Sequence, residues 1–242
     1  MRRSFHRRIS ILVICSLCIS LASRGALASP WSLEEALTQA QQLIQKGDLA
    51  TARKHLTQAM KDFPNEPAVY SFLGVVDAQE GDTRAAEAHF TKAVALGPRY
   101  EGAYLNLGRL YQEQAGADPK AEEKAIDIYK RLLKVNPESV EAKYQLAVLL
   151  NRRGDYRAAL HYLNLLPPSL QERAAALSLL CAGYVGTGKR DKAKEAVQRL
   201  AQSTDLTEQT VVPVLPVLVM HKAQDLAVQL LSALDQRGLA SA

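Results

Sequence analysis

Six alanines recur along the chain at a nearly constant spacing, and this spacing constrains the fold more than any other feature. Successive members stand 34, 39, 34, 34 and 34 residues apart, at Ala52, Ala86, Ala125, Ala159, Ala193 and Ala227. A fixed period of about 20 to 50 residues indicates an array of stacked repeats. With the alanine at the twentieth place, consecutive repeats cover 33–66, 67–100, 101–139, 140–173, 174–207 and 208–241.

Two apolar positions follow each alanine and predict the second helix of the repeat. Four residues on stand Leu56, Phe90, Tyr129, Leu163, Val197 and Leu231, and three further on stand Ala59, Ala93, Leu132, Leu166, Leu200 and Leu234. Spacings of four and three place all of these side chains on one helix face, which must be buried against a neighbour.

A small residue marks the first helix of the repeat. It is Ala40, Gly74, Gly108, Ala147 or Cys181, directly after a large apolar residue in Tyr70-x-x-Leu73-Gly74 and Tyr104-x-x-Leu107-Gly108. A small side chain lets a second helix approach closely. Gly-Asp pairs at 47–48, 81–82 and 154–155 predict the turn between the helices, and Pro64, Pro98 and Pro137 end the second helix.

The chain resembles the tetratricopeptide repeat family over residues 33–241 in this period, these positions and these turns. The resemblance implies an all-α fold, a right-handed superhelical α-solenoid of six helix-turn-helix repeats. It also implies that the first helices line a concave groove and that the protein binds other proteins. Contacts between neighbouring repeats alone favour such an open, extended shape.

The first 28 residues stand outside the array and are typical of a secretory signal peptide. Arg2, Arg3, Arg7 and Arg8 precede an apolar stretch at 9–22, and Ala26-Leu27-Ala28 matches a small-x-small cleavage site. We expect cleavage after Ala28, a mature chain at 29–242, and export to the periplasm or beyond. An anchor that stays uncleaved and an organelle transit peptide are the alternatives.

Removing the leader makes the chain neutral. The whole sequence carries a net charge of +5, but the leader holds five arginines and no acidic residue. A neutral chain gives no reason to expect nucleic-acid binding. No membrane span is expected after cleavage. The local group Lys189, Arg190, Lys192 and Lys194 is interspersed with Asp191 and Glu195, which favours a solvated helix face over a site for an acidic partner.

Three features suggest a nucleotide, thiol or metal site, but each of them has a simpler explanation. Gly183-x-x-x-x-Gly188-Lys189 resembles a phosphate-binding loop, but a helix precedes it and Gly188 falls in the turn between helices. Cys181 falls at the small position, where it should be buried and unreactive. His55 and His89 lack a third metal donor, so we expect surface or half-buried histidines. The sequence predicts no enzyme, no cofactor and no metal.

The resemblance assigns groove positions on the first helices. They include Leu37 and Glu113, together with the candidate protein-binding residues Gln41, Gln45, Ser71, Gln79, Leu105, Arg109, Gln112, Tyr144, Asn151 and Arg152. This amide-rich wall suits an extended peptide. The family's clamp for chaperone tails needs Lys and Asn where this chain has Leu37 and Gln41, so that ligand is not expected.

The sixth repeat is unusually apolar for the end of an array, where a polar outer face is required. We therefore predict a C-terminal interface at Val212, Val219, Met220 and Leu231, which docks a partner or a second copy as a homodimer. Pro213-x-x-Pro216 has the spacing of a polyproline ligand, but the apolar run that follows favours Pro213 as the start of a shortened first helix.

The third repeat carries five extra residues near Ala115-Gly116-Ala117-Asp118-Pro119, which predict a longer loop or a longer second helix. Taken together, these features predict a non-enzymatic scaffold or adaptor in the periplasm or cell envelope. The alternative is an accessory docking subunit of an envelope enzyme or of a polysaccharide or glycosyl-transfer system.

Overall fold

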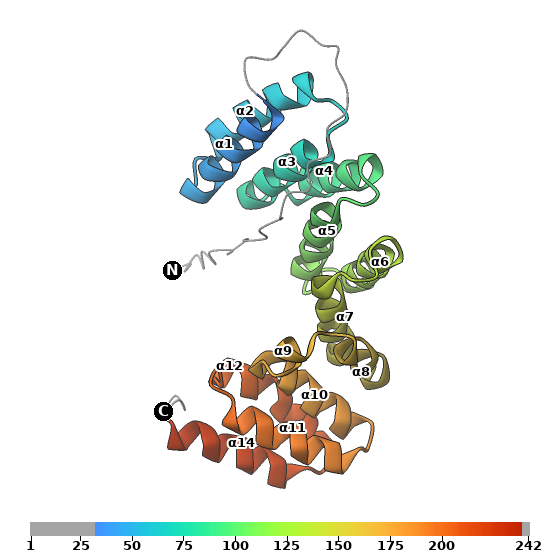
Figure 1. Cartoon of the computed structure of the whole chain (residues 1–242), viewed down its shortest axis with the longest axis vertical. Coiled ribbons are helices and arrows are strands. Elements are labelled where there is room, and N and C mark those ends of the chain that lie inside the picture. Colours follow the sequence, from blue (N-terminus) through green and yellow to red (C-terminus); the bar gives the residue numbers. More distant parts are fainter. Residues whose placement is uncertain (1–31, 239–242) are drawn as a thin grey trace. The chain divides into compact units, whose positions relative to one another are not determined.

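The computed structural model describes residues 32–238 and is built from helices (Figure 1). No β-strand occurs within that range, which confirms the predicted all-α helical repeat fold. The predicted leader at 1–28 and its cleavage site after Ala28 lie outside the described residues. The division into six repeats remains a proposal.

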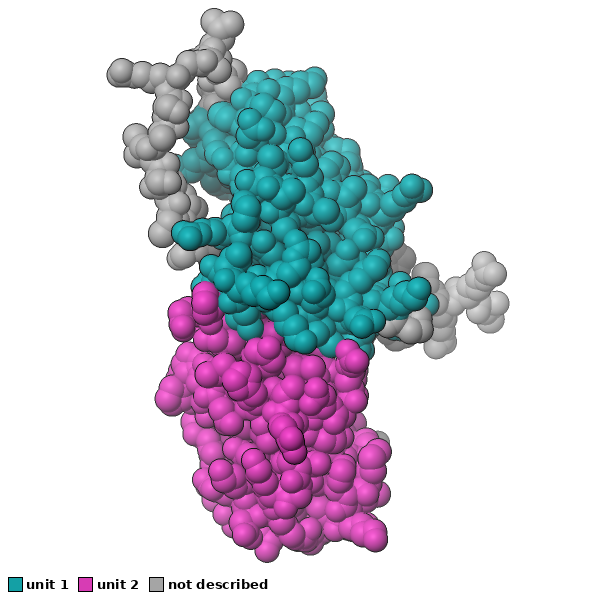
Figure 2. Space-filling view, turned by 90° about the vertical axis from the view of Figure 1, so that its right-hand side faces the viewer, with its two compact units in different colours: residues 1–136 teal, residues 137–242 magenta. Residues whose placement is uncertain are grey.

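The chain forms two compact units, Met1–Asn136 and Pro137–Ala242 (Figure 2). The helices of unit 1 are α1 (Leu33–Lys46), α2 (Leu49–Asp62), α3 (Pro67–Glu80), α4 (Thr83–Leu96), α5 (Glu101–Gln114) and α6 (Pro119–Val135). Those of unit 2 are α7 (Val140–Arg152), α8 (Tyr156–Asn164), α9 (Pro168–Gln171), α10 (Ala174–Gly186), α11 (Arg190–Gln202), α12 (Glu208–Val211), the 3-10 helix η1 (Val212–Val214), α13 (Leu215–Met220) and α14 (Gln224–Gln236).

Glycine and aspartate make the turns between paired helices as the sequence predicts. Gly47 has φ 78° after α1, and the carboxylate of Asp48 accepts a hydrogen bond from the backbone N–H of Thr51. Gly188 has φ 72° between α10 and α11, in the left-handed region that glycine adopts without steric cost. A helix and not a strand precedes Gly188, so the expectation that it is a turn glycine is confirmed.

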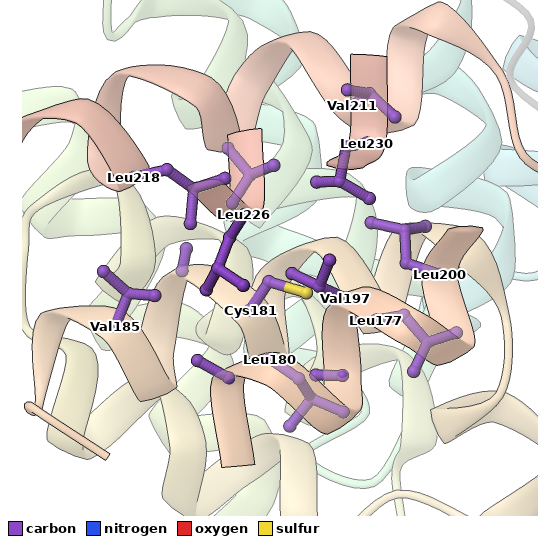
Figure 3. Close-up of a cluster of buried hydrophobic side chains, with 14 of the residues drawn as sticks. Leu177, Leu180, Cys181, Val185, Val197, Leu200, Val211, Leu218, Leu226 and Leu230 are labelled. Atoms are coloured by element: carbon purple, nitrogen blue, oxygen red, sulfur yellow. The ribbon is translucent and has the colours of Figure 1, made fainter. Parts of the chain in front are cut away.

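The two helices of a repeat interlock through one small and one large side chain. A Cβ atom added to Gly74 would lie 2.6 Å from the ring of Phe90, and one added to Gly108 would lie 2.5 Å from the ring of Tyr129. Cys181 and Val197 occupy the same two places in the core of unit 2 (Figure 3). Cys181 is buried, as expected, and burial raises the pKa of its thiol to about 12 because the charged thiolate is poorly solvated there.

The five-residue insertion is divided between a loop and a helix. The turn before α6 has four residues, 115–118, where the turn before α2 has two, and α6 has 17 residues where α2 has 14. The Asp118 carboxylate accepts a hydrogen bond from the backbone N–H of Lys120, and Pro119 stands in the first turn of α6. Both predicted outcomes therefore occur.

The last repeat breaks the interlocking pattern. Leu215 stands where the other repeats have a small residue, and its partner position, Leu231, is 46% exposed although the five equivalent side chains are buried. The neighbouring position, Leu230, is buried in its place. Two large side chains cannot occupy the space of a small and a large one, so Leu231 is displaced from the core while Ala227 and Leu234 stay buried.

The first helix of this repeat also differs from the expectation. The sequence predicts that Pro213 starts it, but α12 already begins at Glu208, and the chain then passes through η1 into α13. Pro213 lies in η1 and Pro216 lies in the first turn of α13. Because proline lacks a backbone N–H, the segment splits into short pieces instead of one helix.

A buried carboxylate joins the first two helix pairs of unit 1. Asp77 of α3 is 1% exposed, and its carboxylate accepts a hydrogen bond from the Arg53 guanidinium of α2 at 2.6 Å. The Nδ1 atom of His89, on α4, lies 2.5 Å from the second carboxylate oxygen. Both His55 and His89 are half-buried, as expected.

A charge at the alanine position should be far more damaging than one on the exposed side of the same helix. We expect Ala86→Glu to lower the free energy of unfolding by about 3 to 5 kcal/mol, because Ala86 is fully buried and no partner awaits a carboxylate there. Ala88→Glu, on the exposed face of α4, should change it by less than about 0.5 kcal/mol. Urea unfolding measures both, and equal midpoints would contradict the register.

A methyl group at Gly108 should disturb the interlock. We expect Gly108→Ala to cost about 1 to 3 kcal/mol, because the Tyr129 ring is buried and its hydroxyl donates to Gln112 at 2.8 Å, so it cannot easily move. Gly116→Ala is the control, since no atom lies within 4 Å of the added Cβ. Adding Tyr129→Leu should make Gly108→Ala less costly, and strictly additive effects would count against the interlock.

Candidate protein-binding surfaces

Unit 1 carries a shallow hollow on its row of first helices. Val75 and Ala78 of α3, Asn106, Arg109, Leu110 and Glu113 of α5, and Phe90 of α4 line it. Asn106 also donates a hydrogen bond from its amide to the Ser71 hydroxyl at 3.2 Å, which ties α5 to α3 below the surface. The hollow is therefore lined by both apolar and polar side chains.

Arg109 and Glu113 lie one helical turn apart on α5 and give the hollow both signs of charge. Desolvation raises the pKa of the Glu113 carboxyl, and the positive charge of Arg109 offsets part of this rise. A ligand with a polar backbone and a small apolar side chain would meet hydrogen-bonding and charged groups together with apolar ones.

The predicted groove residues of unit 1 separate into exposed and buried groups. Gln41 and Gln45 are exposed on α1, while Gln79 and Arg109 are half-buried. Ser71 and Leu105 are buried and cannot contact a ligand in this state. Gln112 is engaged within the fold, because its side-chain oxygen accepts a hydrogen bond from the Tyr129 hydroxyl.

The three predicted groove residues of unit 2 all lie on α7. Tyr144 is half-buried against the core, and desolvation raises the pKa of its hydroxyl. Asn151 is buried and donates its amide to the carbonyl oxygen of Leu179 in α10 at 3.0 Å, so it joins two helices and is not part of the accessible surface. Arg152 is exposed at the end of α7.

Sequence reasoning missed the apolar part of the hollow. Val75 and Ala78 stand at the ninth and twelfth places of the second repeat, which are groove positions by the resemblance. An apolar residue at a groove position gives no distinct signal in the sequence, because the same residue types also pack in the core. Asn106 stands outside those positions, and only the packing of α3 against α5 shows that it faces the hollow.

The C-terminal helices expose several large apolar side chains. Val212, Val219, Met220, Val228 and Leu231 are 48%, 54%, 72%, 61% and 46% exposed. Val212, Val219, Met220 and Leu231 are the predicted interface residues, and Val228 is a further exposed one. Exposed apolar side chains of this number in the last repeat favour a binding surface.

Two further kinds of site are missing from the described part of the chain. Between residues 32 and 238 no three His, Cys, Asp or Glu side chains come together as metal ligands would. In the same range, every helix is too short or too polar to cross a bilayer.

Known protein families match this chain in the region of the repeats. Models described as tetratricopeptide repeat match residues 37–101 and 118–182, together more than half of the chain. Cellulose synthase operon protein C of Xanthomonas axonopodis pv. citri is 42% identical over 91 residues, which are 38% of this chain and 6% of that protein. The chain thus matches only a small part of this relative's length.

Solved structures share the fold at low sequence identity. A tetratricopeptide repeat protein from Parabacteroides merdae superposes with a TM-score of 0.65 and 21% identity, covering 86% of this chain and 80% of that one. PilF of Pseudomonas aeruginosa superposes with a TM-score of 0.64 and 16% identity, covering 86% of this chain and 92% of that one. YrrB, described as having an unusual peptide-binding site, superposes with a TM-score of 0.56 and 18% identity. The match covers 77% of this chain and 90% of that one.

Proposed function

Since this chain belongs to the tetratricopeptide repeat family, we propose that it is a non-enzymatic scaffold that binds an extended protein segment on the first helices of unit 1. The observation that carries the proposal is the hollow at α3 and α5, where Val75 and Ala78 line the surface together with Arg109 and Glu113. The peptide-binding site ascribed to YrrB, a protein of similar fold, supports the same role.

The bound segment follows from the chemistry of this surface. Amide side chains of Gln41, Gln45 and Gln79 offer hydrogen bonds to an extended backbone, whose N–H and C=O groups need partners. A small apolar side chain of the ligand fits over Val75 and Ala78, and Arg109 engages an acidic neighbour. Ser71, Leu105 and Asn151 support the helices without contacting the ligand.

The C-terminal end supplies a second surface in this proposal. Val212, Val228 and Leu231 are exposed because the last repeat lacks the interlock that buries their equivalents. A partner or a second copy would cover them, and the scaffold would then hold two proteins together.

We further propose that the scaffold acts in the periplasm or cell envelope. The basic and apolar leader before Ala28 supports export. Similarity to cellulose synthase operon protein C favours the second candidate function, that of an accessory docking subunit in a polysaccharide-forming system.

Photo-crosslinking tests the binding face. With p-benzoylphenylalanine in place of Gln41 or Glu113, we expect a discrete crosslinked partner in intact cells. With the same photo-reactive residue in place of the exposed Lys54 of α2 or Lys92 of α4, we expect no crosslinked partner. Arg109→Glu should abolish the product at Gln41 by reversing the charge offered to the ligand. The same product from both sets would contradict the assignment, and the identity of the partner separates the two candidate functions.

The N-terminal residue of the chain recovered from cells tests the proposed export. We expect the chain recovered from the envelope fraction to begin at Ser29, because a signal peptidase cleaves after Ala28. Replacing both Ala26 and Ala28 by leucine should leave residue 1 in place, since the cleavage site requires small side chains. A chain that keeps its leader without these substitutions would favour the anchor.

A further inference from the structure

The turns between paired helices in unit 2 are rich in basic side chains. Three turns follow one another at 152–157, 188–192 and 221–225, and they expose Arg152, Arg153, Arg157, Lys189, Arg190, Lys192 and Lys222. We call these seven residues the basic edge. The same segments hold only three acidic residues, Asp155, Asp191 and Asp225.

Two of these acidic side chains are engaged within the fold. The Asp155 carboxylate accepts a hydrogen bond from the backbone N–H of Ala158, and Asp225 pairs with Arg190 at 2.7 Å. Arg153, Lys189 and Lys222 make no ion pair with any residue between 32 and 238. The basic edge therefore keeps an excess of positive charge directed toward solvent.

Contacts between the turns make the basic edge one surface. The ring of Tyr156, in the first turn, lies against α10, since a Cβ added to Gly186 would come within 2.1 Å of it. The same ring stands 5.8 Å from that of His221 in the third turn, measured between centroids. The Arg190–Asp225 pair joins the second turn to the third.

The corresponding turns of unit 1 carry no excess of basic residues. Segments 46–48, 80–84 and 115–120 hold the basic residues Lys46, Arg84 and Lys120 against the acidic residues Asp48, Glu80, Asp82 and Asp118. A basic turn is thus no requirement of the repeat, whose cap needs only glycine and an acceptor. The excess of basic residues belongs to unit 2.

The third turn has two more unusual features. Lys222 has φ 57° and is the sole non-glycine residue with positive φ among residues 32–238, at a turn where four other repeats have glycine at 72° to 86°. Backbone strain of this kind is a reason to look for function. Met220, which ends α13 just before this turn, is 72% exposed.

We propose that the basic edge docks unit 2 on the surface of an anionic phospholipid membrane. Lysine and arginine contact the phosphate groups, and Met220 enters the interfacial region, where an apolar side chain is favoured. Long basic side chains on three turn tips suit a broad charged plane better than a single acidic peptide, which would need a groove. This binding involves neither the hollow of unit 1 nor its ligand.

Flotation with vesicles tests the proposal on the full chain. We expect binding to vesicles of one part phosphatidylglycerol to three parts phosphatidylethanolamine, and weak binding to phosphatidylcholine alone. Arg153→Gln, Lys189→Gln and Lys222→Gln together should lower the partition coefficient about a hundredfold, at about fivefold for each charge removed. Lys54→Gln, Lys61→Gln and Arg84→Gln remove the same charge from exposed positions of unit 1 and should leave it nearly unchanged.

Acetylation of lysines locates the contact even if residues 1–28 also bind the vesicle. With anionic vesicles present, Lys189 and Lys222 should react several times more slowly than in solution, while Lys54 and Lys61 keep their rates. Equal partition of the two triple variants, together with unprotected Lys189 and Lys222, would overturn the proposal. Protection of these lysines by soluble polyglutamate but not by vesicles would also overturn it, in favour of an acidic protein partner.

Discussion

Contact between one small and one large side chain holds the helix pairs α3–α4 and α5–α6 together, and the rest of the structure depends on such pairing. Gly74 against Phe90 and Gly108 against Tyr129 leave no space for a single added carbon. Close approach of the two helices buries the alanine position beside them, and it fixes which faces remain for the neighbouring repeat and for solvent. The proposed binding surfaces are thus faces that this contact leaves uncovered.

The last repeat shows what happens where the contact fails. Leu215 and Leu231 are both large, so Leu230 is buried instead of Leu231, and Leu231 becomes exposed. Pro213 and Pro216 also divide the preceding segment into short helical pieces. An apolar end of the array follows from these local departures, and the same segment carries the strained turn at Lys222.

Sequence reasoning located the helices well because their ends depend on local chemistry. Glycine in the left-handed conformation and aspartate as a cap act within a few residues, so Gly47-Asp48 could be recognised without a structure. The candidate site was harder to predict. Ser71 and Asn151 are polar and stand at groove positions, yet both are buried. Each forms a hydrogen bond with another helix, Ser71 with Asn106 and Asn151 with Leu179. A polar residue type does not reveal whether its partner is solvent or a neighbouring helix.

The sequence by itself determined the repeat period, the buried position of each alanine and the turn role of Gly188, because all of these follow from spacing along one chain. Tertiary structure decided which polar residues reach the surface, where Val75, Ala78 and Arg109 form a hollow, and that Tyr156 meets His221 across two turns. These outcomes depend on contacts between residues far apart in the chain. Their distances are set by packing, and the order of residues does not encode them directly.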